Sequence, residues 1–97
     1  MPRYIILLKM TDQGIRTVKD LPKRVANARQ AVEKAGGKWV DWNLTMGEYD
    51  AVATAEMPSD EVAVTIAMAI GSLGNVRTTT LKAFSESEMI KIIGKLP

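Results

Sequence analysis

The stretch Leu44-Thr45-Met46-Gly47-Glu48-Tyr49-Asp50-Ala51-Val52-Ala53 joins two runs of alternating residues through a single glycine. Glycine adopts positive φ without steric cost, so a glycine between two such runs is typical of a β-hairpin. Residues 38–46 alternate ahead of the turn, and residues 49–56 follow it. The stretch therefore predicts two antiparallel strands, with a phenol and a carboxylate, Tyr49 and Asp50, beside the turn.

Two further segments have the pattern of strands. Residues 3–10 (Arg-Tyr-Ile-Ile-Leu-Leu-Lys-Met) are apolar on both faces, and such a strand must be covered on both sides. Residues 76–84 contain the β-branched run Thr78-Thr79-Thr80, which favours a strand. In the segment before the turn, strict alternation would place Trp39 and Trp42 on opposite faces. We therefore expect four strands in all.

Three segments have helical spacing of their apolar residues. The first begins at Asp20, which has the position of an N-cap, and ends at Gly36-Gly37. The second begins at Ser59 and is apolar nearly all round, so it needs cover from more than the sheet beneath it. The third is short and opens with Ser85 and Glu88 in capping-box spacing. This last helix is amphipathic, and it could dock on its own domain or on a neighbour.

The expected order of elements is β-α-β-β-α-β followed by a C-terminal helix. In one domain, residues 1–97, this order gives an α+β, ferredoxin-like fold: a four-stranded antiparallel sheet with the first and third strands central and two helices on one face. Because the helices cover only one face, apolar side chains on the other, such as Ile5 and Leu7, need a cover from outside the monomer. Another copy of the same sheet is the simplest cover, and we predict a homo-oligomer formed sheet to sheet.

The composition excludes several classes of function. The chain has no Cys and no His, which removes thiolate and imidazole ligands and every Ser-His or Cys-His nucleophile. We expect no cofactor and no metal site, although carboxylates could still bind a hard cation. The net charge is only +2 and basic residues are interleaved with acidic ones, so no nucleic-acid partner is expected. No segment is long enough to span a membrane, and we expect a cytoplasmic protein.

Four separated motifs carry a resemblance to a known family. They are Ala35-Gly36-Gly37-Lys38, the stretch from Leu44 to Asp50, the helix start Pro58-Ser59-Asp60-Glu61, and Leu73-Gly74-Asn75-Val76-Arg77-Thr78 with Leu81-Lys82-Ala83-Phe84. With these motifs in this order, the chain resembles the GYD domain family over nearly its whole length. The resemblance implies a relative of the dimeric α/β barrels, in which two ferredoxin-like sheets face each other around a cavity. It implies no established activity and no catalytic residues.

Tyr49 and Asp50 are the first candidates for a catalytic role. A phenol can donate a proton and a desolvated carboxylate can act as a base, for which Asp41 on the preceding strand is the alternative. The structural alternative is that Tyr49 packs and Asp50 caps backbone amides. Because adjacent strand residues point to opposite faces, at most one member of the pair can enter the same cavity.

Arg77, Asn43 and Trp39 are the candidates for ligand binding. Arg77 could lie across the same cavity as Asp41 and Asn43, and an arginine with a few acceptors suits a small anionic or carbonyl-bearing ligand. The alternative is a polar network that fixes the register of two subunits. Trp39, on the polar side of its strand, is a candidate aromatic wall of the cavity or an interface anchor.

These observations lead to one main hypothesis and one alternative. In the main hypothesis the chain is a homo-oligomeric α/β-barrel domain that binds a small organic ligand between its sheets and could act as a cofactor-independent enzyme. In the alternative it is a non-catalytic module for oligomerisation or regulatory interaction. The sequence leaves open whether the protein is an enzyme.

Overall fold

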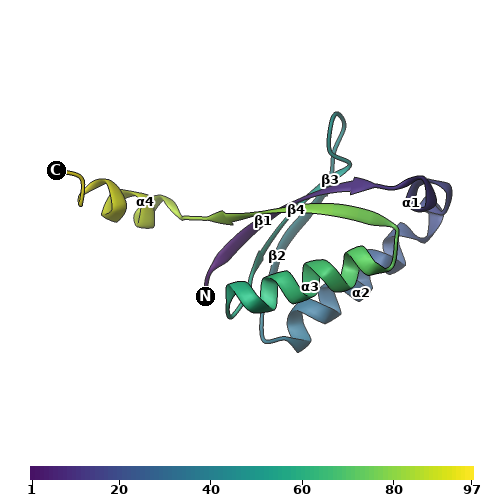
Figure 1. Ribbon diagram of the computed structural model, residues 1–97, viewed down its shortest axis with the longest axis horizontal. Coiled ribbons are helices and arrows are strands. Elements are labelled where there is room, and N and C mark those ends of the chain that lie inside the picture. The colour runs from purple at the N-terminus through teal and green to yellow at the C-terminus, as the bar shows by residue number, and fades with distance from the viewer.

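In the computed structural model, which describes residues 1–97, the four strands and the three expected helices follow the predicted order, and two short helical segments that the prediction lacked precede the first of these helices. The four strands form one antiparallel sheet in the order β2-β3-β1-β4, so the first and third strands are central as predicted. Helices α2 and α3 lie together on one face of this sheet (Figure 1). The fold is therefore a mixed α+β fold whose elements are β1 (Arg3–Met10), α1 (Asp12–Arg16), a 3-10 helix η1 (Val18–Asp20), α2 (Leu21–Lys34), β2 (Lys38–Leu44), β3 (Ala51–Glu56), α3 (Asp60–Ser72), β4 (Val76–Ala83) and α4 (Glu86–Ile93).

The predicted hairpin joins β2 to β3, although β3 begins at Ala51 rather than at Tyr49. Gly47 in the connecting loop has φ of +107°, a conformation that favours glycine. The amide of Thr45 donates to the Asp50 carbonyl at 2.9 Å, and its hydroxyl donates to the Tyr49 carbonyl at 2.6 Å. These two bonds hold the ends of the loop together.

Both tryptophans of β2 face the helices, so the prediction that they lie on opposite faces is wrong. The pairing of β2 with β3 shifts just after Trp39, which marks a β-bulge. Trp39 pairs with Ala55 and Trp42 pairs with Ala53, and these two alanines are buried on the helix-covered face. The extra residue, Val40, resets the alternation on which the prediction relied.

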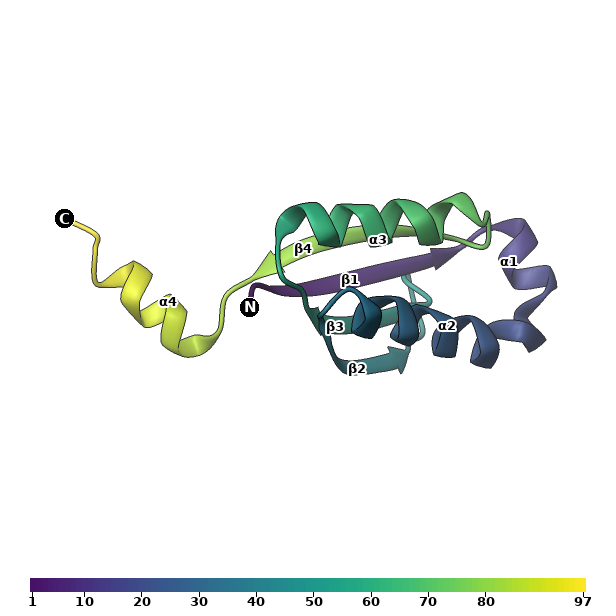
Figure 2. The ribbon, with the colours of Figure 1, turned by 90° about the horizontal axis from the view of Figure 1, so that it is seen from below.

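Packing on the helix-covered face is concentrated at the end of the sheet where α2 finishes and α3 begins. Farther along, α2 and α3 lie apart over the sheet, with β1 visible between them (Figure 2). The largest cluster of buried side chains occupies only part of the layer between helices and sheet. It consists of six buried residues, Tyr4, Val32, Ala55, Met57, Ala63 and Ile66.

Two of the three predicted helix caps are confirmed. The Ser59 side chain accepts a hydrogen bond from the Val62 amide at 3.2 Å at the start of α3. Ser85 and Glu88 form the complete capping box at the start of α4. Asp20 stands at the N-cap of α2 but makes no side-chain capping bond. The helical turn η1 that precedes α2 leaves Asp20 in a helical rather than an extended conformation, which takes its carboxylate away from the capping position.

The opposite end of the sheet is closed by contacts between α1 and the turn after α3. The Thr11 amide donates to the Asn75 carbonyl at 3.0 Å, and the Thr11 hydroxyl donates to the Gly74 carbonyl at 2.6 Å. A Cβ at Gly14 would collide with the Asn75 carbonyl, so α1 and the turn approach as closely as a glycine allows. Hydrogen bonds from the Thr11 amide and hydroxyl hold this end, where Val76 of β4 is also buried.

Helix α4 extends beyond the sheet, away from the layer formed by α2 and α3 (Figures 1 and 2). None of its residues is buried. No helix of the structure combines the length and the apolar character needed to cross a membrane.

Candidate functional site

The face of the sheet opposite the helices has an apolar centre. Register places Ile5 beside Leu81 of β4, and Leu7 beside Val52 of β3, all on this open face. Ile5, Leu7 and Val52 are only half-buried, and Leu81 is exposed. Four apolar side chains in neighbouring positions form a patch that no element of the monomer covers.

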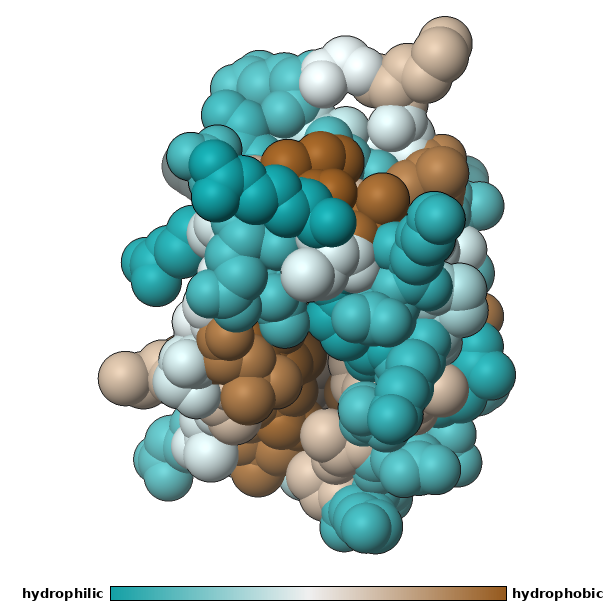
Figure 3. Space-filling model, turned by 90° about the vertical axis from the view of Figure 1, so that its right-hand side faces the viewer, coloured by the Kyte–Doolittle hydropathy of each residue, from teal (hydrophilic) through white to brown (hydrophobic).

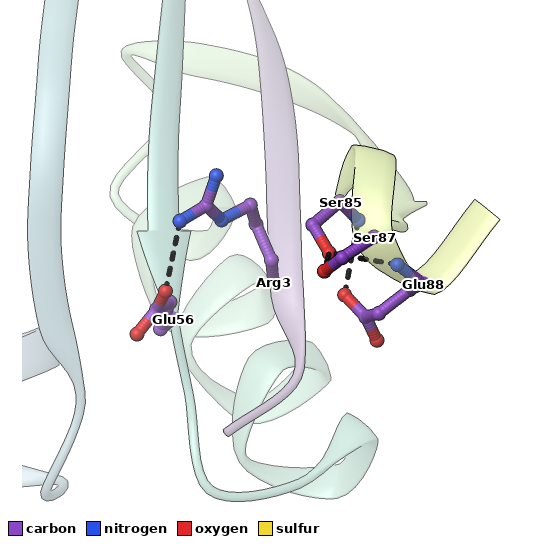
Figure 4. A network of polar contacts seen from close by, with 5 residues as sticks. All are labelled: Arg3, Glu56, Ser85, Ser87 and Glu88. Carbon is purple, nitrogen blue, oxygen red and sulfur yellow. Dashed lines mark hydrogen bonds and ion pairs between the residues drawn. The ribbon is translucent and has the colours of Figure 1, made fainter. Parts of the chain in front are cut away.

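An ion pair borders this open face where β1 begins. Arg3 Nη2 donates to Glu56 Oε2 at 3.0 Å, across the pairing of β1 with β3 (Figure 4). This hydrogen bond, together with the charge of Arg3, holds the pKa of the Glu56 carboxyl below its usual range. Both side chains remain partly exposed, so the pair contributes little to stability.

The candidates Asp41 and Asn43 lie on the same open face, at the β2 edge of the sheet. Asp41 pairs with Thr54 and Asn43 pairs with Val52, and both side chains are exposed. Arg77 belongs to β4, which is the opposite edge, and two strands separate it from the β2 pair. The structure therefore brings Asp41 and Asn43 together but leaves Arg77 apart from them.

The guanidinium of Arg77 lies beside α3. A Cβ on Gly71 would stand 3.8 Å from Arg77 Nη1, so the long side chain reaches from the strand edge to the helix. It borders a shallow hollow on the outside of α3 together with Val64 and Met68. Alternation along β4 could predict the face of the Arg77 backbone position but not this turn around the edge.

Asp50 fastens the hairpin to the central strand. Its amide donates to the Leu8 carbonyl at 2.8 Å, and its carboxylate oxygen Oδ2 accepts from the Met10 amide at 2.7 Å. A carboxylate that accepts a hydrogen bond from a backbone amide in this way extends the hydrogen bonding of β1 beyond its pairing with β3. The geometry matches the structural alternative given above, in which Asp50 caps backbone amides.

Tyr49 is half-buried next to a lysine. Lys9 Nζ stands 5.7 Å from the centre of the Tyr49 ring and 3.9 Å from Glu48 Oε1. A cation at this distance from an aromatic face is attracted to it, although weakly at an exposed site. The phenol and the Asp50 carboxylate thus have different neighbours, Lys9 for one and the Met10 amide for the other.

A cluster that sequence reasoning missed joins Tyr4, Asp60 and Lys82. The Tyr4 hydroxyl donates to Asp60 Oδ1, and Lys82 Nζ lies 3.2 Å from the same oxygen. Tyr4 is 3% exposed, and this burial, with the bond to Asp60, raises the pKa of the phenol to about 12. The bonds from Tyr4 and Lys82 hold the pKa of the Asp60 carboxyl below its usual range. Tyr4 and Asp60 are 56 positions apart, so no local pattern could reveal the contact.

The cluster of Tyr4, Asp60 and Lys82 has a structural role. At neutral pH the phenol keeps its proton and the carboxylate is ionised, so neither group is poised to exchange a proton. Asp60 is the first residue of α3, and it therefore connects the start of this helix to β1 and β4. No group of three or more acidic side chains that could hold a metal ion occurs in the structure.

The C-terminal helix presents a second uncovered apolar surface. Ser85 Oγ accepts from the Glu88 amide at 3.2 Å and Glu88 Oε1 accepts from the Ser85 amide at 2.9 Å, so the helix is well capped (Figure 4). The bond from the Ser85 amide, together with the Ser85 hydroxyl, holds the pKa of the Glu88 carboxyl below its usual range. Ile90 and Ile93 are nevertheless 60% and 55% exposed. We call the apolar side of this segment the α4 stripe; it consists of Phe84, Met89, Ile90, Ile93 and Leu96.

The sequence matches the GYD domain family over residues 4–93. It is similar to a Thermus thermophilus protein named "Glutamine synthetase and cystathionine beta-lyase binding protein", with 34% identity over 94 residues that cover 93% of this chain and 96% of the relative.

Two solved structures share the fold. One is the crystal structure of a Thermus thermophilus protein, with 24% identity, a TM-score of 0.56, and coverage of 88% of this chain and 95% of that one. The other is the leucine response regulatory protein of Mycobacterium tuberculosis, with 15% identity and a TM-score of 0.57. This match covers 87% of this chain and 51% of the regulatory protein.

Proposed function

Because this chain belongs to the GYD domain family, we propose that it is a homo-oligomeric interaction module that binds another protein. The observation that carries this proposal is the α4 stripe, which projects from the domain with no residue of α4 buried. The relative from Thermus thermophilus is named for binding two enzymes, glutamine synthetase and cystathionine beta-lyase. We extend that role to this chain and expect its partner to be a metabolic enzyme of the same kind, in the cytoplasm.

The length and character of α4 support this role. Isolated helices shorter than about 12 residues are marginal in water, and α4 has 8 residues. A short helix with an exposed apolar stripe gains stability when the stripe enters a groove on another protein. The capping box organises its first turn in advance, which lowers the entropy cost of docking.

The interaction test compares two double variants of α4. Ile90→Asp with Ile93→Asp removes the stripe, whereas Ser87→Asp with Lys91→Gln makes the same change in charge on the opposite side of the helix. Binding of each to purified glutamine synthetase and cystathionine beta-lyase of the same organism is measured by biolayer interferometry. We expect the stripe variant to lose binding at least tenfold and the control to keep it. The role is refuted if the stripe variant binds an enzyme as tightly as the unmodified protein does. It is also refuted if the unmodified protein binds neither enzyme.

The open face supports the homo-oligomeric part of the proposal. A sheet-to-sheet pair related by a two-fold axis would bury the patch of Ile5, Leu7, Val52 and Leu81 against the same patch of the second copy. Light scattering tests this with Leu81→Glu, which places a charge in the patch, and Met68→Glu, which places one on the outside of α3. We expect the first variant to reduce the measured mass to that of a monomer and the second to leave it unchanged.

A small organic ligand between paired sheets is the second candidate function. The proximity of exposed Asp41 and Asn43 on the open face favours it. In this candidate Tyr49 acts as acid and Asp50 or Asp41 as base, and Arg77 holds a substrate anion after its side chain turns from α3 to the open face. Native mass spectrometry of the purified oligomer tests the idea. A bound molecule that disappears in Tyr49→Phe supports it, and an oligomer without one leaves the interaction module as the function.

A further inference from the structure

A cleft of about 500 Å³ lies between α2 and α3, above the central strands. It is separate from the open face and from the α4 stripe. Figure 3, which views the α1 end of the molecule, shows apolar side chains in a hollow below the sheet, among hydrophilic ones. Small-molecule sites in proteins have volumes of roughly 300–1,000 Å³ and mostly apolar walls, and this cleft has both properties.

The cleft exists because small side chains meet there from three elements. Alanines project from α2 (Ala28 and Ala31), from α3 (Ala67) and from β3 (Ala53), and they leave space that larger side chains would fill. Trp39 and Trp42 of β2 form an aromatic wall, and Ile6 and Leu8 of β1 lie along the floor. The enclosure suits an extended apolar molecule.

One charged side chain, that of Arg24, lines the cleft. Its Nη2 atom donates to the Gly14 carbonyl at 3.1 Å and to the Thr17 carbonyl at 2.7 Å, which ties the guanidinium to α1. Its Nε and Nη1 atoms are buried without a hydrogen-bond partner, and no other side-chain nitrogen or oxygen of the chain is in this position. None of the three ion pairs of the structure includes Arg24, so no carboxylate of the protein neutralises it.

We propose that this cleft binds a small molecule with an apolar body and a carboxylate head, of the chemical class of a medium-chain fatty acid. The apolar body occupies the space between the alanines and the tryptophans. The Arg24 nitrogens without partners are covered in the unliganded protein, and they donate to the carboxylate when the guanidinium turns toward the cleft. Buried donors without partners carry a desolvation penalty, and a bound anion would relieve it. This inference is independent of the protein-binding role and of a ligand between the sheets.

The test uses decanoate and its uncharged counterpart, decanol, as probes in isothermal titration calorimetry. Decanoate should bind the unmodified protein saturably and at least tenfold more tightly than decanol, because only the carboxylate engages Arg24. Arg24→Met keeps the apolar stem of the side chain and should abolish that difference. Lys23→Met removes the same charge from the neighbouring position on the exposed side of α2 and should leave it intact.

A third variant, Ala28→Phe, fills the cleft without altering the charge. It should remove the binding of both probes, and a thermal melt that stays as sharp and as high as that of the unmodified protein shows that the fold is intact. The proposal is overturned if decanol binds as tightly as decanoate, if Arg24→Met keeps the decanoate affinity, or if no saturable binding occurs. If decanoate binds the monomer but not the oligomer, a second copy of the chain occupies the cleft. That result would also overturn the proposal.

Discussion

The two ends of the layer between helices and sheet differ in how they are packed. Where α2 finishes and α3 begins, Val32, Met57 and Ala63 are each less than 5% exposed. Near α1, Leu21 is only half-buried and Leu73 is 66% exposed, although both border the same layer. Stability should therefore depend mainly on the packed end, while the other end keeps space that a ligand can occupy.

The largest change in the free energy of unfolding is expected from a substitution at the packed end. Met57→Ala leaves a cavity in the core cluster and should lower the free energy of unfolding by about 2–5 kcal/mol. Leu21→Ala, at the end near α1, removes a half-exposed side chain and should cost about 1 kcal/mol. Urea denaturation measures both values. Equal losses at the two sites would mean that the ends do not differ in packing.

Added volume should distinguish the ends in the same way. Ala63→Leu inserts a larger side chain where no room exists, and overpacking of this kind costs about 1–3 kcal/mol. Ala28→Leu extends into the cleft and should change the free energy of unfolding by about 0.5 kcal/mol or less, because it meets no packed neighbour. The same denaturation experiment checks the pair, and a destabilised Ala28→Leu would show the cleft to be already filled.

The packed end should also give the protein a dependence on alkaline pH. The pKa of Tyr4 is about 12 in the folded protein and 10.0 by the ordinary value, because the phenol is buried and bonded to Asp60. Between these values the unfolded chain loses the phenol proton while the folded protein keeps it, so the free energy of unfolding falls as pH rises. Tyr4→Phe should remove this fall in urea denaturation from about pH 9 upward. An equally steep fall in the variant would assign it to other groups.

In acid the Asp60 carboxyl acts in the opposite direction. Its folded pKa lies below the ordinary value of 3.8, so its contribution is present above that value and is lost as pH falls through the folded pKa. Asp60→Asn should therefore make the free energy of unfolding, measured by urea denaturation, fall less steeply as pH decreases below about 4. Glu56, whose pKa is also lowered, maintains part of the remaining slope.

The smallest effect on the stability of the whole domain is expected from changes in α4, which belongs to neither end of the layer. Ser85→Ala removes half of the capping box and should destabilise α4 locally by about 1 kcal/mol, seen as faster hydrogen exchange of its amides. The midpoint of urea denaturation should not move, because no residue of α4 is buried. Ser59→Ala removes the matching cap of α3 and should lower that midpoint. A lower midpoint in Ser85→Ala would place α4 within the cooperative unit.

Local features of the site followed from the sequence. Alternation along β2 placed Asp41 and Asn43 on one face, and the spacing of Ser85 and Glu88 identified the cap of α4. These features depend on residues within a few positions of each other. The surroundings of Arg77 and Arg24 did not follow, because each guanidinium is positioned by an element elsewhere in the chain, α3 for one and α1 for the other.

By itself the sequence determined the order of the strands and of α2, α3 and α4, the glycine turn at Gly47 and the amphipathic character of α4, since periodicity and local backbone preference suffice for these. Only the tertiary structure decided that a bulge after Trp39 turns both tryptophans toward the helices, and that Tyr4 meets Asp60. It also decided that alanines from three elements leave a cleft beside Arg24. The physical reason is that side-chain volumes and buried donors acquire their partners only when distant segments pack against one another.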